Sequence, residues 1–139
     1  MIVQQVVIAV IRKNNKYLLT KRTEINPEDS QFAPYVWNFP GGGVKKNESY
    51  QQALTREIKE ELNVSLDKIV RIPKIFSDTR GQWQGIFNVF LCSLKDEKQE
   101  IILNEEASEY NWFTTNEIKN LKTLPFTFEI AQEADKINL

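Results

Sequence analysis

Short runs of β-branched residues open the chain and predict a pair of strands. Residues 3–11 are rich in valine and isoleucine, and residues 16–20 form a second apolar run. Asn14 and Asn15 lie between the two runs, and asparagine is favoured in tight turns. This pattern predicts a β-hairpin. A polar stretch with two prolines follows at residues 23–35 and predicts a loop.

The rest of the chain alternates between strand-like and helix-like segments. Residues 36–39 predict a short strand that ends at Pro-Gly-Gly-Gly, residues 40–43, which we interpret as a turn. Further elements are expected in this order: strands at 69–77 and 85–94, joined near 80–82, an acidic loop at 95–109, a strand at 110–113, and helices at 115–120 and 126–137. Strands interleaved with helices predict an α/β (α+β) layered domain. No break in composition divides residues 1–139, so we expect a single domain.

The clearest helical pattern begins after the glycine-rich segment. Its apolar residues recur at intervals of four: Leu54, Ile58 and Leu62. Asn47 is predicted to cap this helix and Glu48 to begin it, since negative charge favours the positive end of the helix dipole. Asn63 is expected to end it, because asparagine tolerates the left-handed backbone that often follows a helix.

Composition and charge restrict the chemistry that the chain can perform. Its 139 residues include 18 basic and 19 acidic ones, a net charge of -1, which argues against stable nucleic-acid or membrane-surface binding. The single cysteine, Cys92, excludes an intramolecular disulfide and a multi-cysteine zinc site. The absence of histidine excludes Ser-His-Asp and Cys-His sites and histidine-bound zinc. Carboxylates, lysine or arginine, hydroxyls, or a metal held by oxygen remain.

The apolar stretch at residues 2–11 predicts neither a targeting signal nor a membrane span. Gln4 and Gln5 interrupt it, and it has no basic leader and no small-residue cleavage site. A bilayer-spanning helix needs about 20 apolar residues, which is far more than this stretch offers. We therefore expect a cytoplasmic protein.

Three glutamates of the predicted helix form the strongest candidate site. Glu57, Glu60 and Glu61 are spaced three and four residues apart, so they share one face beside the apolar stripe. Like charges at this spacing repel by about 0.2–0.5 kcal/mol per pair. Mg²⁺ or Mn²⁺, which prefer oxygen ligands, would cancel that repulsion. The alternative is a solvated acidic face with no ligand.

The glycine-rich segment before the helix allows two interpretations. It is not a Walker A loop, because no Gly-Lys-Ser/Thr follows. It could be a plain tight loop. Beside a carboxylate cluster, however, glycines let backbone groups approach a ligand closely, and they can complete a cradle for metal and phosphate.

Together these residues resemble the Nudix hydrolase signature, Gly-x5-Glu-x7-Arg-Glu-U-x-Glu-Glu-x-Gly-U, in which U is aliphatic. The matching positions are Gly42, Glu48, Arg56, Glu57, Ile58, Glu60, Glu61 and Val64. Asn63 replaces the usual glycine, and asparagine can adopt the same left-handed backbone. Residues 37–42, the first hairpin and residues 112–113 resemble MutT-type members as well. The resemblance implies an α/β/α sandwich with a mixed sheet between helices.

Nudix enzymes cleave a nucleoside diphosphate linked to another group, using a divalent metal and water. The resemblance implies Mg²⁺, with Mn²⁺ as a substitute, held by these groups: Glu57, Glu60, Glu61, the Gly41 carbonyl and Glu106. In the loop at residues 103–109, Glu105 and Glu109 are the alternatives to Glu106. The general base is Glu57 or a loop glutamate. Arg56 is expected to orient the glutamates or, alternatively, to pair with Glu60 on the surface, and Glu48 is expected to be structural.

The resemblance also implies a nucleotide as the small-molecule partner, most simply a nucleoside triphosphate cleaved to a monophosphate and pyrophosphate. The candidate substrate-binding residues are Arg22, Gly42, Phe39 and Arg80. The two arginines could contact a substrate phosphate, although arginines at such positions are more often surface residues. Phe39, Trp37 and Phe87 could stack on a base, although core packing is the more common role for each of them. ADP-ribose or dinucleoside polyphosphate hydrolysis and a non-catalytic nucleotide sensor are the alternatives. MutT-type enzymes carry a base-reading asparagine where this chain aligns Phe128, so the base stays open.

Overall fold

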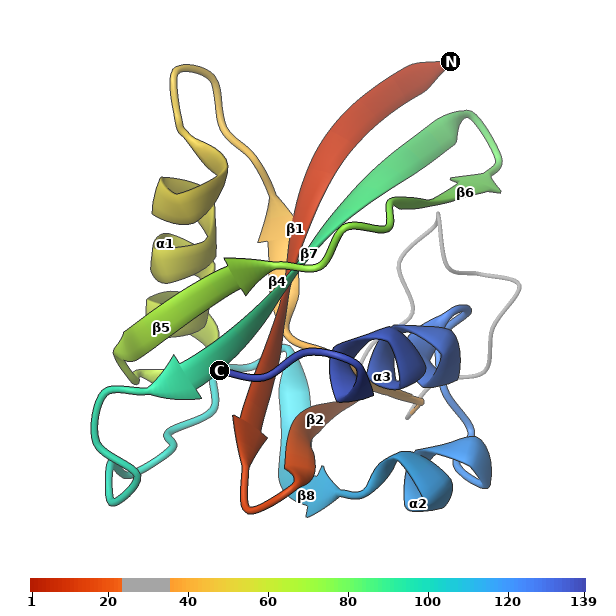
Figure 1. The fold of residues 1–139 in the computed structure, drawn as a ribbon. Coiled ribbons are helices and arrows are strands. Elements are labelled where there is room, and N and C mark those ends of the chain that lie inside the picture. The colour runs from red at the N-terminus through yellow and green to blue at the C-terminus, as the bar shows by residue number, and fades with distance from the viewer. Residues whose placement is uncertain (24–35) are drawn as a thin grey trace.

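Strands dominate the computed structural model, which describes residues 1–23 and 36–139 (Figure 1). Most of the loop predicted at residues 23–35 lies outside the described residues. The strands are β1 (Ile2–Lys13), β2 (Lys16–Arg22), β3 (Trp37–Asn38), β4 (Gly41–Gly43), β5 (Leu66–Arg71), β6 (Phe76–Arg80), β7 (Trp83–Leu94) and β8 (Ala107–Phe113). The helices in the described part are α1 (Tyr50–Leu62), α2 (Thr115–Lys119) and α3 (Thr127–Asp135), and none of these is long and apolar enough to pass through a bilayer.

The strands form one mixed sheet. Its order is β3-β2-β1-β7-β5, while β4 pairs with β1, β6 with β7 and β8 with β2. β1 and β7 run parallel over a continuous register from Ile2↔Trp83 to Ile11↔Cys92. The other pairings are antiparallel. This arrangement confirms the predicted α/β (α+β) class with a mixed sheet.

Helices cover both faces of the sheet: α1 lies on one face, and α2 and α3 lie on the other (Figure 1). Successive side chains of a strand point to opposite faces, so β1 contributes to two cores. Val7, Ala9 and Ile11 pack with the apolar face of α1. Val10 packs with residues of α2 and α3. The sheet is therefore buried on both sides, which holds α1 firmly against it.

Helix α1 begins two residues later than predicted. Ser49, not Asn47, is its N-cap, and Ser49 Oγ accepts a hydrogen bond from the Gln52 N–H at 3.1 Å. The Gln52 side chain in turn accepts from the Ser49 N–H at 2.8 Å, which completes a capping box. Asn47 has a positive φ of 65° in the turn before the helix. The predicted end is confirmed, because Asn63 is left-handed with a φ of 56°.

The first hairpin is confirmed, whereas one turn prediction and one strand prediction are wrong in detail. Asn14 and Asn15 form the hairpin turn with φ values of 53° and 61°. The predicted turn at residues 40–43 contains strand β4, because Gly41–Gly43 pairs with residues 6–8 of β1. The predicted strand at residues 69–77 is divided into β5 and β6, and both pair with β7.

Candidate active site

The glycines of β4 bring the sheet close to α1. Gly41 pairs with Ile8 and Gly42 pairs with Val7 across β4 and β1. A Cβ atom on Gly41 would overlap the Val7 carbonyl oxygen, and one on Gly42 would overlap the carboxylate of Glu57. Glycine is therefore needed at position 42 for Glu57 to lie directly against this strand, and at position 41 for β4 to lie this close to β1.

Arg56 is held by hydrogen bonds to the strand, the turn and the helix of the motif. Its Nε and Nη2 donate to the two carboxylate oxygens of Glu48 at 2.7 and 2.9 Å, and its Nη1 donates to Glu57 Oε1 at 2.8 Å. Its Nη2 also donates to the Gly43 carbonyl at 3.0 Å. The Arg56 hydrogen bonds, assisted by the Lys45 N–H, lower the pKa of Glu48 to about 2. Glu48 thus anchors Arg56, and Arg56 fixes the orientation of Glu57.

Glu60 lies on the outer side of this group. Its side chain is 53% exposed, whereas that of Glu57 is 15% exposed. The Glu60 Oε2 is 3.5 Å from Arg56 Nη1, so the i,i+4 pair considered from the sequence is present together with the Arg56–Glu57 contact. The two interpretations of Arg56 are therefore compatible in this structure.

Glu61, Glu57 and Glu106 form a crowded set of carboxylates. Burial, followed by the negative charges of Glu106 and Glu57, raises the pKa of Glu61 to about 9. The Gly41 N–H, which donates to Glu61 Oε2 at 3.4 Å, opposes this shift only in part. Desolvation and the charge of Glu57 raise the pKa of Glu106 as well. This part of the site holds more negative charge than its neighbours neutralise.

The chemistry of these carboxylates fits a divalent cation. Mg²⁺ and Mn²⁺ bind carboxylate and carbonyl oxygens, and a cation would relieve the repulsion that raises these pKa values. Within residues 1–23 and 36–139, no three acidic or cysteine side chains are already arranged as a metal-binding group. The carboxylates of Glu57, Glu61 and Glu106 are close enough to influence one another electrostatically. To bind one ion together, they would have to move closer to each other.

The acidic loop before β8 brings Glu106 to the carboxylates of α1. The Glu106 carbonyl accepts a hydrogen bond from the Thr23 N–H at 3.1 Å, which ties the loop to the end of β2. Glu106 and Glu61 line the same cavity, whereas Glu105 and Glu109 do not line it. Of the three loop glutamates considered from the sequence, Glu106 is thus the one placed beside α1.

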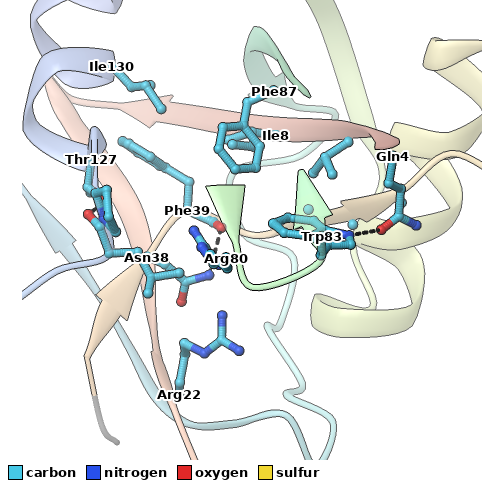
Figure 2. Close-up of a pocket in the computed structure, with 16 residues that line it drawn as sticks. Gln4, Ile8, Arg22, Asn38, Phe39, Arg80, Trp83, Phe87, Thr127 and Ile130 are labelled. Carbon is cyan, nitrogen blue, oxygen red and sulfur yellow. Dashed lines mark hydrogen bonds between the residues drawn. The ribbon is translucent and has the colours of Figure 1, made fainter. Parts of the chain in front are cut away.

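Two cavities meet at this place. The acidic cavity has a volume of about 290 Å³, and its walls include Glu61, Glu106 and Thr20. The aromatic cavity has a volume of about 330 Å³, and its walls include Phe39, Trp83 and Phe87 (Figure 2). Arg22, Asn38 and Gly41 line both cavities. A single ligand can therefore extend from the aromatic rings to the carboxylates.

Arg80 lies with the aromatic rings. It lines the aromatic cavity and not the acidic one, and its side chain is only 7% exposed. Its Nε donates to Asp78 Oδ2 at 3.0 Å, and its guanidinium carbon is 5.4 Å from the centre of the Trp83 ring. The alternative of a surface arginine is therefore wrong for Arg80, because the strand pairing of β6 and β7 buries it.

The aromatic residues considered from the sequence divide between the cavity and the core. Phe39 and Phe87 line the aromatic cavity and also belong to the core on the α3 side of the sheet. Trp37 does not line this cavity, because its ring packs edge-on against the ring of Phe113, with 5.0 Å between the two ring centres. Phe128 does not line it either, and its neighbour Thr127 does.

Sequence reasoning missed Trp83, Gln4, Asn38 and Thr127 as parts of the site. Trp83 and Phe87 lie four residues apart on one strand and so share a face, which is a signal that the sequence offered. The Trp83 Nε1 donates to Gln4 Oε1 at 2.9 Å, across the parallel pairing of β7 with β1. Asn38 and Thr127 reach the cavity only through the tertiary fold, and no local pattern predicts that.

Comparison with known proteins agrees with this geometry. The model of the NUDIX domain family matches residues 2–133. The chain therefore belongs to the Nudix family and is a Nudix hydrolase. It is 31% identical over 115 residues to the nucleoside triphosphatase NudI of Escherichia coli O139:H28 (strain E24377A / ETEC), a match that covers 77% of this chain and 79% of the relative. NudI of Klebsiella pneumoniae (strain 342) is 31% identical over 123 residues, 83% of this chain and 84% of the relative.

Solved structures show the same fold. A MutT NUDIX hydrolase from Burkholderia pseudomallei superposes with a TM-score of 0.80 at 20% identity, over 96% of this chain and 98% of that one. The NUDIX domain of Shewanella oneidensis NrtR, complexed with ADP ribose, superposes with a TM-score of 0.76 at 16% identity, over 98% of this chain and 88% of that one. The fold that the signature implied is thus confirmed.

Proposed function

We propose that the chain hydrolyses nucleoside triphosphates to a nucleoside monophosphate and pyrophosphate, with Mg²⁺ as the cofactor and Mn²⁺ as a substitute. The observation that carries this proposal is the connection of an acidic cavity to an aromatic one through Arg22, Asn38 and Gly41. A nucleoside triphosphate has the same two parts, a charged polyphosphate that binds metal and a planar base. The NudI relatives, named nucleoside triphosphatases, support the same substrate class.

The proposed oxygen donors to the cation are the carboxylates of Glu57, Glu60, Glu61 and Glu106 and the carbonyl of Gly41. When bound, the cation supplies neutralisation of the phosphate charge and a lower pKa for a water ligand. Arg56 keeps Glu57 in a single orientation through its 2.8 Å hydrogen bond. Phosphoryl transfer asks a protein mainly for such positioning and charge stabilisation.

The remaining proposed roles follow from the two cavities. Arg22 lines both of them, and we assign it to a phosphate oxygen of the substrate. Gly42, Phe39 and Arg80 line the aromatic cavity, and we assign them to contact with the nucleoside. The oxygen of water bonds to one phosphorus of the α–β bridge, and the bridging oxygen leaves with the bonding electron pair. The proton of that water passes to Glu57 or Glu106.

A nucleotide screen tests this function. Ribo- and deoxynucleoside triphosphates are incubated with the protein and Mg²⁺, and phosphate is measured with and without added inorganic pyrophosphatase. Phosphate that appears only with pyrophosphatase supports the proposal. The matched control is Glu61→Gln, which keeps the side-chain shape and removes a carboxylate. The proposal is contradicted if Glu61→Gln releases as much phosphate as the wild-type protein. It is also contradicted if the wild-type protein releases no phosphate from any triphosphate.

ADP-ribose is the second candidate substrate, because the NrtR domain with the same fold was solved with that ligand. Dinucleoside polyphosphates belong in the same screen as a third group. Binding of a nucleotide without hydrolysis would instead indicate a sensor. We propose the cytoplasm as the location, because nucleoside triphosphates are abundant there.

A further inference from the structure

Asn38 occupies the junction between the acidic and aromatic cavities. It lies on β3, opposite Thr20 of β2, and it lines both cavities together with Arg22 and Gly41. Figure 2 shows its amide between Phe39 and Arg22. A nucleotide that places its base among the aromatic rings and its phosphates near the carboxylates must pass its sugar through this junction.

One polar atom of Asn38 is left without a hydrogen bond. Its Nδ2 donates to the Phe39 carbonyl at 3.1 Å. Its Oδ1 is shielded from solvent and accepts no hydrogen bond from the part of the chain that the structure describes. The reversed amide would set its oxygen against the Phe39 carbonyl oxygen, so the Nδ2 bond fixes the orientation. Asn38 thus has an unused acceptor rather than an unused donor.

The chemistry of a nucleotide limits what can satisfy this acceptor. A buried acceptor without a partner costs free energy, which a ligand recovers when it supplies a donor. Phosphate oxygens are acceptors at neutral pH and would repel Oδ1. The base is expected farther into the aromatic cavity, beside Trp83 and Phe87. The uncharged donors left for the junction are the hydroxyl groups of the sugar.

We propose that Asn38 Oδ1 accepts a hydrogen bond from a pentose hydroxyl of the substrate and makes the enzyme discriminate between sugars. This inference rests on the proposed function, since it assumes a nucleoside triphosphate that spans both cavities. It adds a specificity-determining contact that lies outside the signature residues of α1 and β4.

The test compares three forms of one nucleoside triphosphate: the ribo form, the 2′-deoxy form and the 2′,3′-dideoxy form. Along this series one hydroxyl is removed at a time. For the wild-type protein, kcat/KM falls by about tenfold or more between the form that carries the contacted hydroxyl and the form that lacks it. A fall between the ribo and 2′-deoxy forms indicates that the 2′ hydroxyl is bound, and a fall between the 2′-deoxy and dideoxy forms indicates the 3′ hydroxyl. Asn38→Leu, which removes the acceptor, lowers kcat/KM only for the forms that carry the bound hydroxyl.

Asn116→Leu is the matched control, because it makes the same exchange at an exposed position of α2 that lines neither the acidic nor the aromatic cavity. This variant keeps the wild-type preference among the three sugars. If Asn38→Leu does not fold, Asn38→Ser takes its place, since serine is too short to reach the same point.

Three results overturn the inference while leaving the proposed function intact. They are equal kcat/KM of the wild-type protein for all three sugars, an equal loss in Asn38→Leu for all three, and an effect of Asn38→Leu that follows the base instead of the sugar. A wild-type protein that hydrolyses none of the triphosphates contradicts the proposed function itself, and this inference falls with it.

Discussion

Arg56 and Glu61 lie on the same helix in opposite electrostatic surroundings. Hydrogen bonds to Glu48, and then to Glu57, raise the pKa of the Arg56 guanidinium, which therefore stays charged and fixed. Glu61 accepts a hydrogen bond from the Gly41 N–H at 3.4 Å, while burial and the negative charges of Glu106 and Glu57 raise its pKa. The charges of Arg56 and Glu48 thus neutralise each other and hold both side chains in place. The carboxylate of Glu61 instead has carboxylates near it and would be stabilised by a cation.

The first prediction concerns the three glutamates of α1. Replacing Glu57, Glu60 or Glu61 singly with glutamine should lower kcat by about 10² or more, because charge stabilisation in the transition state is lost. The fold should persist, since glutamine has the same shape and relieves repulsion. Turnover and thermal unfolding of each variant check this. Variants that unfold while the folded fraction keeps normal activity would show that the cluster is structural.

The second prediction concerns the pH dependence of the metal-free protein. The pKa of Glu61 is raised by burial and by Glu106 and Glu57 from 4.5 to about 9, so the folded chain binds more protons than the unfolded chain in this window. The free energy of unfolding should therefore fall as the pH rises from about 4.5 to about 9. Chemical denaturation in EDTA at several pH values measures it.

Glu61→Gln should weaken that pH dependence, and saturating Mg²⁺ should weaken it in the wild-type protein. If the metal-free wild type becomes more stable between pH 5 and about 9 to the same extent as the variant, Glu61 is not held protonated in the fold.

At the scale of elements, the site is the contact between strand β4 and helix α1. The glycines of β4 allow Glu57 to approach the strand, and the capping box of Ser49 and Gln52 fixes where α1 begins. The buried stripe Ala53, Leu54, Ile58 and Leu62 sets which side chains of the helix face the sheet. The loop before β8 adds Glu106 from a third direction.

The third prediction tests the capping box. Ser49→Ala should destabilise the protein by about 1 kcal/mol, because the Gln52 N–H loses its acceptor. Asn47→Gly is the control, since glycine adopts the positive φ of that turn and Asn47 is not the cap. Chemical denaturation of both variants gives the result. A larger loss in Asn47→Gly than in Ser49→Ala would restore Asn47 as the cap.

The fourth prediction tests the loop carboxylate. Glu106→Gln should reduce kcat more than it reduces Mg²⁺ affinity of the free enzyme, because a loop ligand matters most once substrate is bound. Glu109→Gln is the matched control, since Glu109 lies in β8 opposite Lys21 and should leave kcat unchanged. Turnover together with calorimetric metal titration measures both effects. A silent Glu106→Gln beside a damaged Glu109→Gln would move the assignment to Glu109.

The sequence predicted those elements whose signals are local. The β-branched run of β1, the Asn14–Asn15 turn and the apolar stripe of α1 each lie within a dozen residues and were found. Strand β4 was missed, because its glycines resemble a turn until they pair with β1, more than 30 residues earlier. The same limit applies to the site: the signature located Glu57 and Glu61, whereas Asn38 depends on tertiary packing.

At the scale of the whole molecule, strand β1 connects the parts of the site. It pairs with β4, which faces the carboxylates, and with β7, which carries Trp83 and Phe87. Helices on both faces keep this central pairing buried. The two cavities therefore have a fixed relation to each other, as a substrate with a polar and an aromatic end requires.

Identification of the reaction products tests the proposed hydrolysis most directly. A nucleoside triphosphate is incubated with the metal-stripped protein, with and without added Mg²⁺, and the products are separated by ion-exchange chromatography. We expect equal amounts of nucleoside monophosphate and pyrophosphate with Mg²⁺, the same products with Mn²⁺, and no hydrolysis in EDTA. Nucleoside diphosphate and phosphate as products, or undiminished turnover in EDTA, would contradict it.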